Sequence, residues 1–422
     1  FFKPYYYSFV LGHYYLTKDN LKCIESFIGK KNQKFVNDFE NNFANLIGDG
    51  KCFSYASARM GFYEVMKAIN IGEGDEVILL GFTCSVMANA VIKRRAIPIY
   101  SDIDKKTYGS SEESIKKCLS EKTKMIIAQH SFGIPCDIVA IKKLAQKYNL
   151  FLLEDCALTL SSSISNINVG NFGDAAIFST DHTKPINTMT GGIVYTKKDY
   201  LIKKLKLSKK LIPEISYKKQ LSLFNQIKIE KYFCNPKNNG KFYFFNLLML
   251  IKKKFLHYEE PFLCDEFSSR IKSSYPYPAN IPTFLAILGL IEISRWREVK
   301  SQRIYNLKKF IKCSEELNIS LPQAYTNNNL EIVPLRFAFA IKDCYLIKKN
   351  LSKPLDTNSF WFLKPLIGSK EPLENFFYRK NSCPKSELIG KSIVNLPCNL
   401  DEYSTNQLCS ILKDSLTTNS KT

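Results

Sequence analysis

The chain has 422 residues, of which 45% are hydrophobic and 23% charged, and its formal net charge is +21 at pH 7. This length and apolar content can bury a large core, which excludes a disordered protein and predicts two domains, or one large domain with a smaller one. The positive charge does not favour nucleic-acid binding as the main function. The excess is mostly lysine in a chain also rich in Asn, Ile, Phe and Tyr, which is the bias of AT-rich codons.

Cysteine usage and hydropathy indicate a cytoplasmic protein. The 13 cysteines include no C-x-x-C pair, so we expect no metal site, and reduced thiols fit the cytoplasm best. The first twelve residues lack the basic start and the small-residue cleavage site of a signal peptide. The most apolar run, residues 242–251, has half the length, ~20 residues, that crosses a bilayer. We therefore expect no transmembrane span.

Short apolar runs alternate with helical patterns over residues 51–195, which predicts an α/β fold with a mostly parallel sheet flanked by helices. The first helix follows Ser57, and its apolar residues Phe62, Val65, Met66 and Ile69 recur with helical spacing on one face. The elements expected after this helix are a turn and strand over 72–80, strands at 97–100, 125–130, 151–155, 175–180 and 191–196, and a helix near 138–148.

The pattern changes after residue 197. Residues 201–256 hold 14 lysines and two glutamates, and a long helical pattern begins near Pro282. We expect an N-terminal segment over 1–35, a large catalytic domain over 36–265 with a lysine- and aromatic-rich insertion at 201–256, and a small C-terminal α/β domain over 266–422. The last eight residues, 415–422, are typical of a disordered tail.

Asp155 ends the predicted strand 151–155. The carboxyl ends of parallel strands face the crevice in which open α/β sheets bind ligands. A buried carboxylate there needs a cationic or strongly hydrogen-bonding partner. Taken alone, Asp155 is better explained by a helix cap or a core ion pair, so a role in a site depends on the residues around it.

Two further features, a helix start before Asp155 and a loop lysine after it, complete the order of residues expected of a cofactor site. Ser57-Ala58-Arg59 opens a helix, where backbone N–H groups are free to bind a phosphate. Lys184 lies in a loop after the strand 175–180, five residues beyond Ser179. A lone loop lysine is usually a solvated charge, whereas one directed into a crevice beside a carboxylate can serve as a Schiff-base nucleophile. The order of a helix start, a strand-end acid and a loop lysine favours the interpretation of Lys184 as a Schiff-base nucleophile.

These residues resemble the DegT/StrS-type sugar-nucleotide aminotransferases, which are fold type I enzymes of the aspartate aminotransferase class that use pyridoxal 5'-phosphate. The resemblance covers residues 36–200 and is looser in ILGLIEISRW, residues 287–296. The segments that carry it are VNDFENNFANLIG (36–48), SAR (57–59), NIGEGDEVILLGFT (70–83), AIPIYSDID (96–104), HSFGIPCD (130–137), LEDCA (153–157), VGNFGDAAIFS (169–179), TK (183–184) and GGIVYT (191–196).

The resemblance implies roles for individual residues. Lys184 would form the Schiff base and carry the proton, and Asp155 would pair with the ring nitrogen of the cofactor. The remaining implied contacts are the cofactor phosphate for Ser179 and the N–H groups of Ala58 and Arg59, the ring faces for Ala157 and Cys84, and a place near the substrate for His130. For His130, a satisfied histidine at a strand end is an equally good interpretation.

Three positions depart from the family pattern. Leu158 stands where most members have Gln or His, and Cys84 replaces the usual aromatic stacking residue. The Asn-x-Arg segment that relatives contribute from the partner subunit is absent near residues 278–283, where Asn280 is the candidate. We expect Leu158 to change the rate or the substrate preference.

The resemblance implies amino transfer from an amino acid, L-glutamate in most relatives, to a nucleotide-linked keto sugar by a homodimer with its active site at the interface. The alternatives are a non-catalytic regulator or polyanion-binding scaffold, and an enzyme of the same fold with a non-sugar substrate. Residues 242–251, followed by Lys252, Lys253 and Lys254, also allow contact with an anionic membrane surface, although burial of this run is the simpler expectation.

Overall fold

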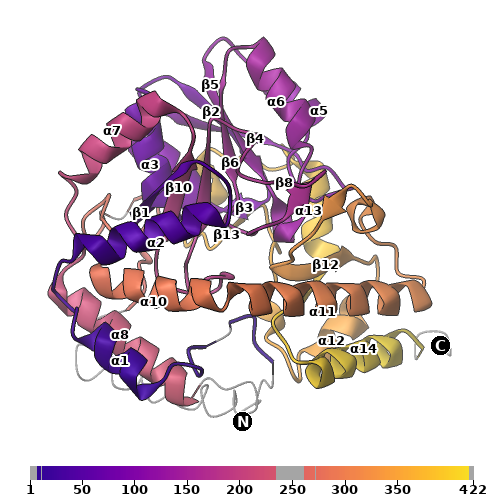
Figure 1. The fold of residues 1–422 in the computed structure, drawn as a ribbon. Helices are drawn as coiled ribbons and strands as arrows, with labels where there is room; N and C mark the ends of the chain where they lie inside the picture. Colours follow the sequence, from indigo (N-terminus) through magenta and orange to yellow (C-terminus); the bar gives the residue numbers. More distant parts are fainter. Residues whose placement is uncertain (1–6, 11, 234–260, 271, 418–422) are drawn as a thin grey trace.

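The computed structural model describes residues 7–10, 12–233, 261–270 and 272–417. A seven-stranded sheet forms its centre (Figure 1). In spatial order its strands are β1 (Lys51–Tyr55), β10 (Gly192–Thr196), β9 (Ala175–Ser179), β6 (Phe151–Asp155), β5 (Thr123–Gln129), β2 (Glu76–Leu80) and β4 (Ile97–Ser101). In this sheet β10 runs opposite to the other six strands, which share one direction. The predicted mostly parallel α/β sheet is confirmed.

Helices cover both faces of the sheet, because successive strand residues point to opposite sides. In β2, Val77 and Leu79 belong to the core that contains α3 and α4, whereas Ile78 packs with α5 and α6 on the other face. The helices of this part of the chain are α2 (Gln33–Asn45), α3 (Ala58–Ala68), α4 (Ser85–Lys93), α5 (Glu112–Lys116), α6 (Ile138–Lys147) and α7 (Asp199–Lys209).

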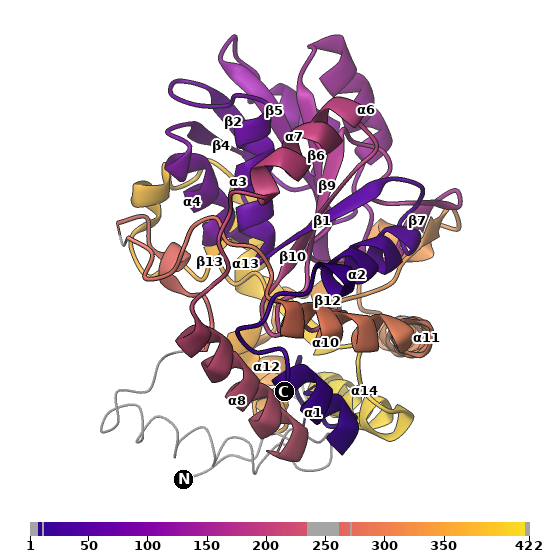
Figure 2. The ribbon, with the colours of Figure 1, turned by 60° about the vertical axis from the view of Figure 1, so that its left-hand side comes forward.

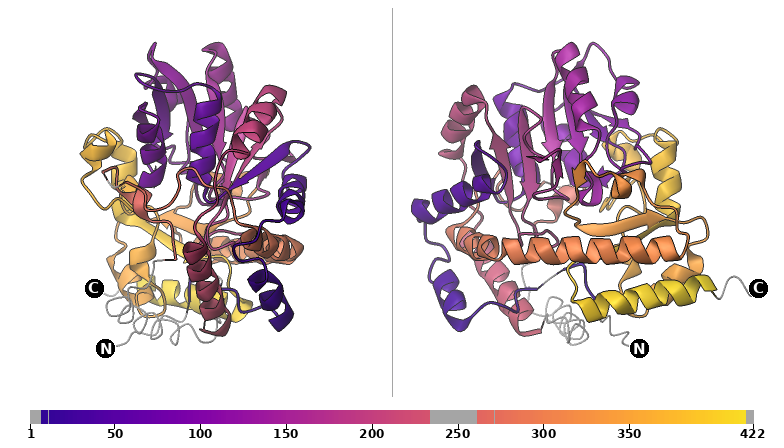
Figure 3. Two further views of the ribbon diagram at one scale, coloured as in Figure 1. Left: turned by 90° about the vertical axis from the view of Figure 1, so that its left-hand side faces the viewer. Right: turned by 45° about the vertical axis from the view of Figure 1, so that its right-hand side comes forward.

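A second core lies in the C-terminal part of the chain. It is built on the pair β12 (Arg336–Ala340) and β14 (Ile393–Pro397), and its buried residues lie between Leu307 and Leu412, apart from Ile134. Its helices are the C-terminal half of α11 (Trp296–Glu316), α12 (Tyr345–Leu351) and α14 (Glu402–Thr417). Figure 3 shows α14 alongside α11, at the end of the molecule away from the large sheet. The predicted domain boundary at residue 266 stays a prediction.

The long helical pattern after Pro282 forms two consecutive helices, α10 (Thr283–Ser294) and α11, which meet at Arg295 and run end to end beneath the sheet in Figure 1. Figure 2 shows α1 (Lys18–Glu25) beside α8 (Tyr217–Phe233). The remaining elements are α13 (Pro384–Ser392) and the short strands β3 (Thr83–Cys84), β7 (Ser163–Ile164), β8 (Ile167–Asn168), β11 (Leu330–Glu331) and β13 (Leu366–Ile367).

One sequence prediction is wrong in part, and another cannot be judged. Helix α14 continues to Thr417 and Ser415 is buried, so the predicted tail does not begin at residue 415. The Ser415 hydroxyl is satisfied by the backbone oxygen of Ile411, which lets a polar residue pack inside the helix. The apolar run 242–251 and Lys252 to Lys254 lie outside the described residues. Within the described ranges, no helix combines the length and the hydropathy that a membrane span requires, and the cysteines are free thiols.

Candidate active site

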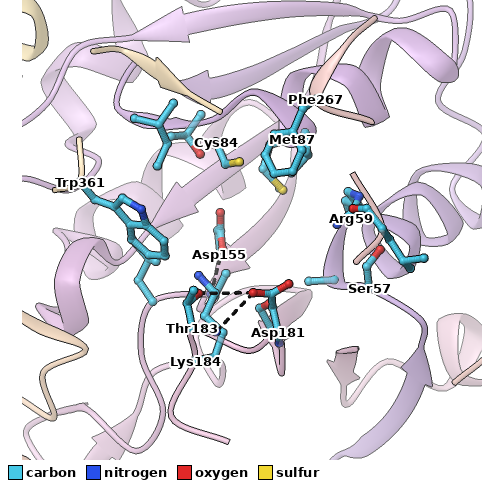
Figure 4. A pocket seen from close by; sticks show the side chains of 18 of the residues that line it. Ser57, Arg59, Cys84, Met87, Asp155, Asp181, Thr183, Lys184, Phe267 and Trp361 are labelled. Atoms are coloured by element: carbon cyan, nitrogen blue, oxygen red, sulfur yellow. Dashed lines mark hydrogen bonds between the residues drawn. The ribbon is translucent and has the colours of Figure 1, made fainter. Parts of the chain in front are cut away.

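A cavity of about 310 Å³ lies at the carboxyl ends of the central strands (Figure 4). This is where open α/β sheets bind their ligands, because the loops that follow parallel strands meet at one edge. The cavity is lined by the last residues of β5, β6 and β9, by residues after β2, β6 and β9, and by the start of α3. Residues from two segments distant in the sequence, within 262–267 and 361–367, complete it. Every residue predicted to hold the cofactor lines this cavity.

Lys184 reaches the cavity from the loop after β9 (Figure 4). A turn fixes its backbone, since its N–H donates to the backbone oxygen of Asp181 at 2.9 Å. Its amine lies 4.3 Å from the centre of the Trp361 ring. Burial lowers the pKa of Lys184 to about 8, against the opposing charge of Asp181. Near neutral pH, a larger fraction of this amine is therefore neutral and nucleophilic than in a solvated lysine.

Asp155 lies at the end of β6 and is 4% exposed. One carboxylate oxygen accepts the backbone N–H of Ala157 at 2.9 Å. Burial raises the pKa of Asp155, while this hydrogen bond and the charge of Lys184 act against the rise. Figure 4 shows the carboxylate directed into the cavity between Cys84 and Lys184. A buried carboxylate in this position suits a cationic ring nitrogen as its partner.

The start of α3 has the features of a phosphate site. Ser57 caps the helix but makes no side-chain capping bond, and its buried hydroxyl has no hydrogen-bond partner among the described residues. The N–H groups of Ala58 and Arg59 belong to the first turn, which has no acceptors of its own. The Arg59 guanidinium is turned away to Glu266, at 2.7 Å. The cavity side of this helix end is therefore formed by backbone groups and a small hydroxyl.

The other predicted contacts lie around these three features. Cys84, Ala157, Leu158 and Ser179 all line the cavity. Leu158 is 5% exposed and also packs in an apolar cluster that contains Phe362. The roles assigned to these residues stay predictions.

His130 and Asn280 are not among the residues that line the cavity. The ring of His130 is fully buried, with Nε2 3.1 Å from Glu154 and Nδ1 accepting the N–H of Cys136 at 3.0 Å. These contacts satisfy both ring nitrogens, as in a structural histidine. The amide nitrogen of Asn280 donates to the backbone oxygens of Lys209 and Ile212.

His130 forms a buried group with Glu154 and Cys156, whose potential metal-ligand atoms lie within 4.8 Å of one another. The carboxylate of Glu154 already accepts the backbone N–H groups of Gly170, Phe172 and Gly173. These bonds tie the end of β6 to the turn before β9. The group is therefore explained by its role in the fold.

Several cavity residues were not predicted from the sequence. Asp181 and His182 lie beside Lys184 in the chain, with their side chains 2.9 Å apart. Burial would raise the pKa of Asp181, but His182, Lys184 and the Thr183 N–H lower it to about 2. Their positions, three and two residues before the lysine, could have identified them. Trp361 is far away in the sequence, and no local signal connects it with Lys184.

Comparisons with known proteins match the N-terminal half of the chain to one family. A model of the DegT/DnrJ/EryC1/StrS aminotransferase family matches residues 19–220. An uncharacterized protein of Methanocaldococcus jannaschii is 36% identical over 45% of this chain and 48% of its own. A GDP-perosamine synthase of Vibrio cholerae is 31% identical over 43% of this chain and 50% of its own. The matched segment thus spans about half the length of these curated relatives.

Solved structures extend the likeness to the whole fold. A putative sugar aminotransferase from Streptococcus pneumoniae in its PMP form superimposes with a TM-score of 0.72, at 16% identity, over 96% of this chain and 98% of its own. An aminotransferase from Psychrobacter cryohalolentis gives a TM-score of 0.70 at 18% identity, over 96% and 98%. These likenesses confirm the predicted fold. Residues 19–220, slightly less than half of the chain, are thus similar to the DegT/DnrJ/EryC1/StrS aminotransferase family.

Proposed function

We propose that this protein is a pyridoxal-phosphate-dependent aminotransferase that moves an amino group from L-glutamate to a nucleotide-linked keto sugar. The observation that carries the proposal is the position of Lys184, whose amine lies in one cavity with the Asp155 carboxylate and the open start of α3. The match of residues 19–220 to the aminotransferase family model and the names of relatives support the substrate class. One relative, 35% identical over 40% of this chain, is a UDP-N-acetyl-3-dehydro-alpha-D-glucosamine 3-aminotransferase of Acidithiobacillus ferrooxidans.

The residues present fit the cofactor. Its phosphate suits the unpartnered hydroxyl of Ser57 and the N–H groups of Ala58 and Arg59. Its ring nitrogen suits the buried carboxylate of Asp155. When bound, the cofactor supplies an aldehyde that condenses with amines and a ring that withdraws electrons from the attached carbon. The protein contributes binding, orientation and proton transfer.

Lys184 has two tasks in this proposal. Its neutral amine is the nucleophile that holds the cofactor, which its pKa of about 8 permits. The same amine would also be the base that takes and returns the proton at the reacting carbon of the amino donor. Asp155 keeps the opposite end of the ring protonated, because a buried carboxylate gains most from a cation at contact distance.

We infer in addition that the protein acts in the cytoplasm as a homodimer. Free thiols at Cys84 and Cys156, in and beside the cavity, suit a reducing compartment. A dimer would allow the partner subunit to contribute to substrate binding, for which Asn280 is the candidate from the sequence. Sedimentation of the protein at micromolar concentration tests the dimer.

Borohydride trapping tests the proposed function. After incubation with pyridoxal 5'-phosphate, reduction should fix the cofactor on Lys184, as peptide mapping would show. L-glutamate should bleach the near-visible absorbance of the unreduced complex. Lys184→Ala should abolish both signals, while the control Lys124→Ala, at an exposed position of β5, should keep them. Reduced cofactor on another lysine, or no response to any amino acid, would refute the proposal and favour a non-catalytic scaffold.

The role of Asp155 is tested in the same assay. Asp155→Ala should bind the cofactor weakly and lose the response to glutamate, because the ring nitrogen loses its carboxylate partner. Asp155→Glu should keep part of both. Wild-type donor kinetics in the alanine variant would contradict the assigned role.

A further inference from the structure

The chain before residue 19 lies outside the part that matches the family, yet it contacts the loop that carries Lys184. His13 is fully buried. Its Nδ1 lies 2.8 Å from a carboxylate oxygen of Glu230, on α8, and its Nε2 lies 3.0 Å from the backbone oxygen of Asn187. Asn187 is three residues beyond Lys184. His13 therefore joins the N-terminal segment and α8 to the loop that carries Lys184.

The surroundings of His13 require a charged ring. Both neighbours, a carboxylate and a carbonyl oxygen, are acceptors, and a neutral imidazole has only one N–H to donate. Beside an ionised Glu230, only the imidazolium can donate to both oxygens. Burial opposes this charge, but the hydrogen bond and charge of Glu230, aided by Glu292, raise the pKa of His13. The contact to Asn187 is thus a charge-assisted hydrogen bond.

The backbone at Asn187 is held from other sides as well. Its N–H donates to Oε2 of Glu292, on α10, at 3.3 Å. Its side-chain oxygen accepts the N–H of Met189 at 2.9 Å. The loop after Lys184 is therefore fixed at one residue by the N-terminal segment and by α10.

The same N-terminal segment supports the indole next to the Lys184 amine. Phe9 stacks on one face of the buried Arg336 guanidinium at 3.9 Å. Trp361 lies 4.0 Å from this guanidinium, and the amine of Lys184 lies 4.3 Å from the centre of the Trp361 ring. Nearby, the N–H of Tyr7 donates to the backbone oxygen of Pro354 at 2.9 Å. Phe9 thus limits how far the indole can move from the lysine.

We propose that the described residues between 7 and 16 form a strap that positions Lys184. His13 fixes the loop after Lys184. Phe9 supports Trp361, whose ring lies against the Lys184 amine. Both are positioning residues, since neither lines the cavity. What Lys184 does once positioned rests on the proposed function, but its environment can be measured without the cofactor.

The test is the pH dependence of Lys184 acetylation by trace acetic anhydride, read by peptide mapping in the cofactor-free protein. The groups that set the charge around this amine are Asp181, Cys84, Arg336 and Asp155, with His182 beside Asp181. A displaced lysine gains water, so the pH at its reaction midpoint rises toward that of free lysine. A contact that serves only overall stability would leave this midpoint unchanged.

Two substitutions at His13 separate its two bonds. Asn places an amide nitrogen near the position of Nδ1 and keeps the bond to Glu230, whereas Gln places one near Nε2 and keeps the bond to Asn187. His13→Asn should raise the midpoint by about one pH unit. His13→Gln combined with Glu230→Gln, which avoids an unpaired buried carboxylate, should stay close to the wild-type midpoint. Equal midpoints in His13→Asn and the wild type, or equal shifts in both variants, would overturn the role of His13.

Phe9 provides an independent test that does not depend on the buried ion pair. Phe9→Leu removes the ring that stacks on Arg336 and should raise the Lys184 midpoint, whereas Phe9→Tyr keeps the ring and should not. If His13→Asn fails to fold, as thermal unfolding would show, this pair decides the proposal. A Lys184 midpoint that is the same in Phe9→Leu and the wild type would then refute the strap.

Discussion

At the scale of single residues, the reactivity of Lys184 depends on its surroundings more than on its position in the sequence. The sequence order of a helix start, a strand-end acid and a loop lysine predicted which lysine enters the cavity. It could not predict a pKa of about 8, because burial is the main cause and follows from residues that pack only in the folded chain. Leu263 and Trp361 are two such residues in the cavity wall.

Removing the nearest carboxylate should make Lys184 still easier to deprotonate. The charge of Asp181 raises the pKa of Lys184, against the effect of burial. Asp181→Asn should therefore move the midpoint of Lys184 acetylation below that of the wild type. The simultaneous loss of charge on His182 reduces this shift, because His182 relies on Asp181 for its raised pKa.

A carboxylate outside the cavity provides the control for Asp181. Asp137→Asn removes a charge of the same sign from the start of α6, and it should leave the Lys184 midpoint unchanged. An upward shift in Asp181→Asn would contradict the electrostatic explanation.

Leu158 tests whether a cavity residue can be distinguished from a core residue. It lines the cavity but also packs near Phe362. Leu158→Gln should change the amination rate or the preference among keto sugars, because the amide restores the polar contact that relatives offer. Steady-state kinetics and urea unfolding should be compared. Unchanged kinetics with a loss of about 2–5 kcal/mol in unfolding free energy, typical of a disrupted buried leucine, would assign Leu158 to the core.

At the scale of elements, most strands and helices of the large sheet follow from local patterns. Alternation and helical spacing located β2, β4, β5, β6 and β9 to within a residue or two. The break between α10 and α11 at Arg295 was not predicted. The helical sequence pattern runs on across this residue, and only the backbone geometry separates the two helices. The strands β3 and β13 pair across 282 residues of chain, from Thr83 to Leu366. Two-residue pairings such as this one have no local sequence signal.

The start of α3 depends on a glycine in the adjacent strand. A Cβ on Gly192 would lie 2.1 Å from the backbone nitrogen of Ala58, so any larger residue must displace the helix end. Gly192→Ala should weaken binding of pyridoxal 5'-phosphate by about ten-fold or more, measured by titration of its absorbance, because the N–H groups of Ala58 and Arg59 move. Gly72→Ala, with its nearest atom at 4.0 Å, should bind as the wild type does. Equal affinities would show that the helix start does not hold the phosphate.

At the scale of the whole molecule, the cavity is assembled from parts that the chain brings together only in the folded state. The large sheet supplies Asp155 and Ser179, the segment before α10 supplies Phe262, and the C-terminal part supplies Trp361. Sequence patterns predicted the first group, because motif residues lie at strand ends. They could not predict Phe262 and Trp361, because these residues reach the cavity only through the packing of both cores.

The link between the N-terminal segment and α8 should make stability depend on pH. The pKa of His13 is raised in the folded protein above its ordinary value of 6.5, chiefly by Glu230 against burial. Its contribution to stability is therefore complete below pH 6.5 and is lost as the pH rises through the folded pKa. The loss amounts to about 1.4 kcal/mol for each pH unit between the two pKa values.

Urea unfolding of the wild type and of the double variant His13→Gln, Glu230→Gln at several pH values measures this contribution. Other titrating groups affect both proteins alike, so they cancel in the difference between the two free energies of unfolding. The difference should favour the wild type most at pH 6 and decrease steadily toward pH 9. As the pH rises, the His13 ring loses one of its two N–H donors, so one of the two acceptor oxygens beside it is left unpaired. A difference that stays constant from pH 6 to pH 9 would mean that His13 does not titrate in this range, and a difference that grows with pH would mean that it is buried in its neutral form.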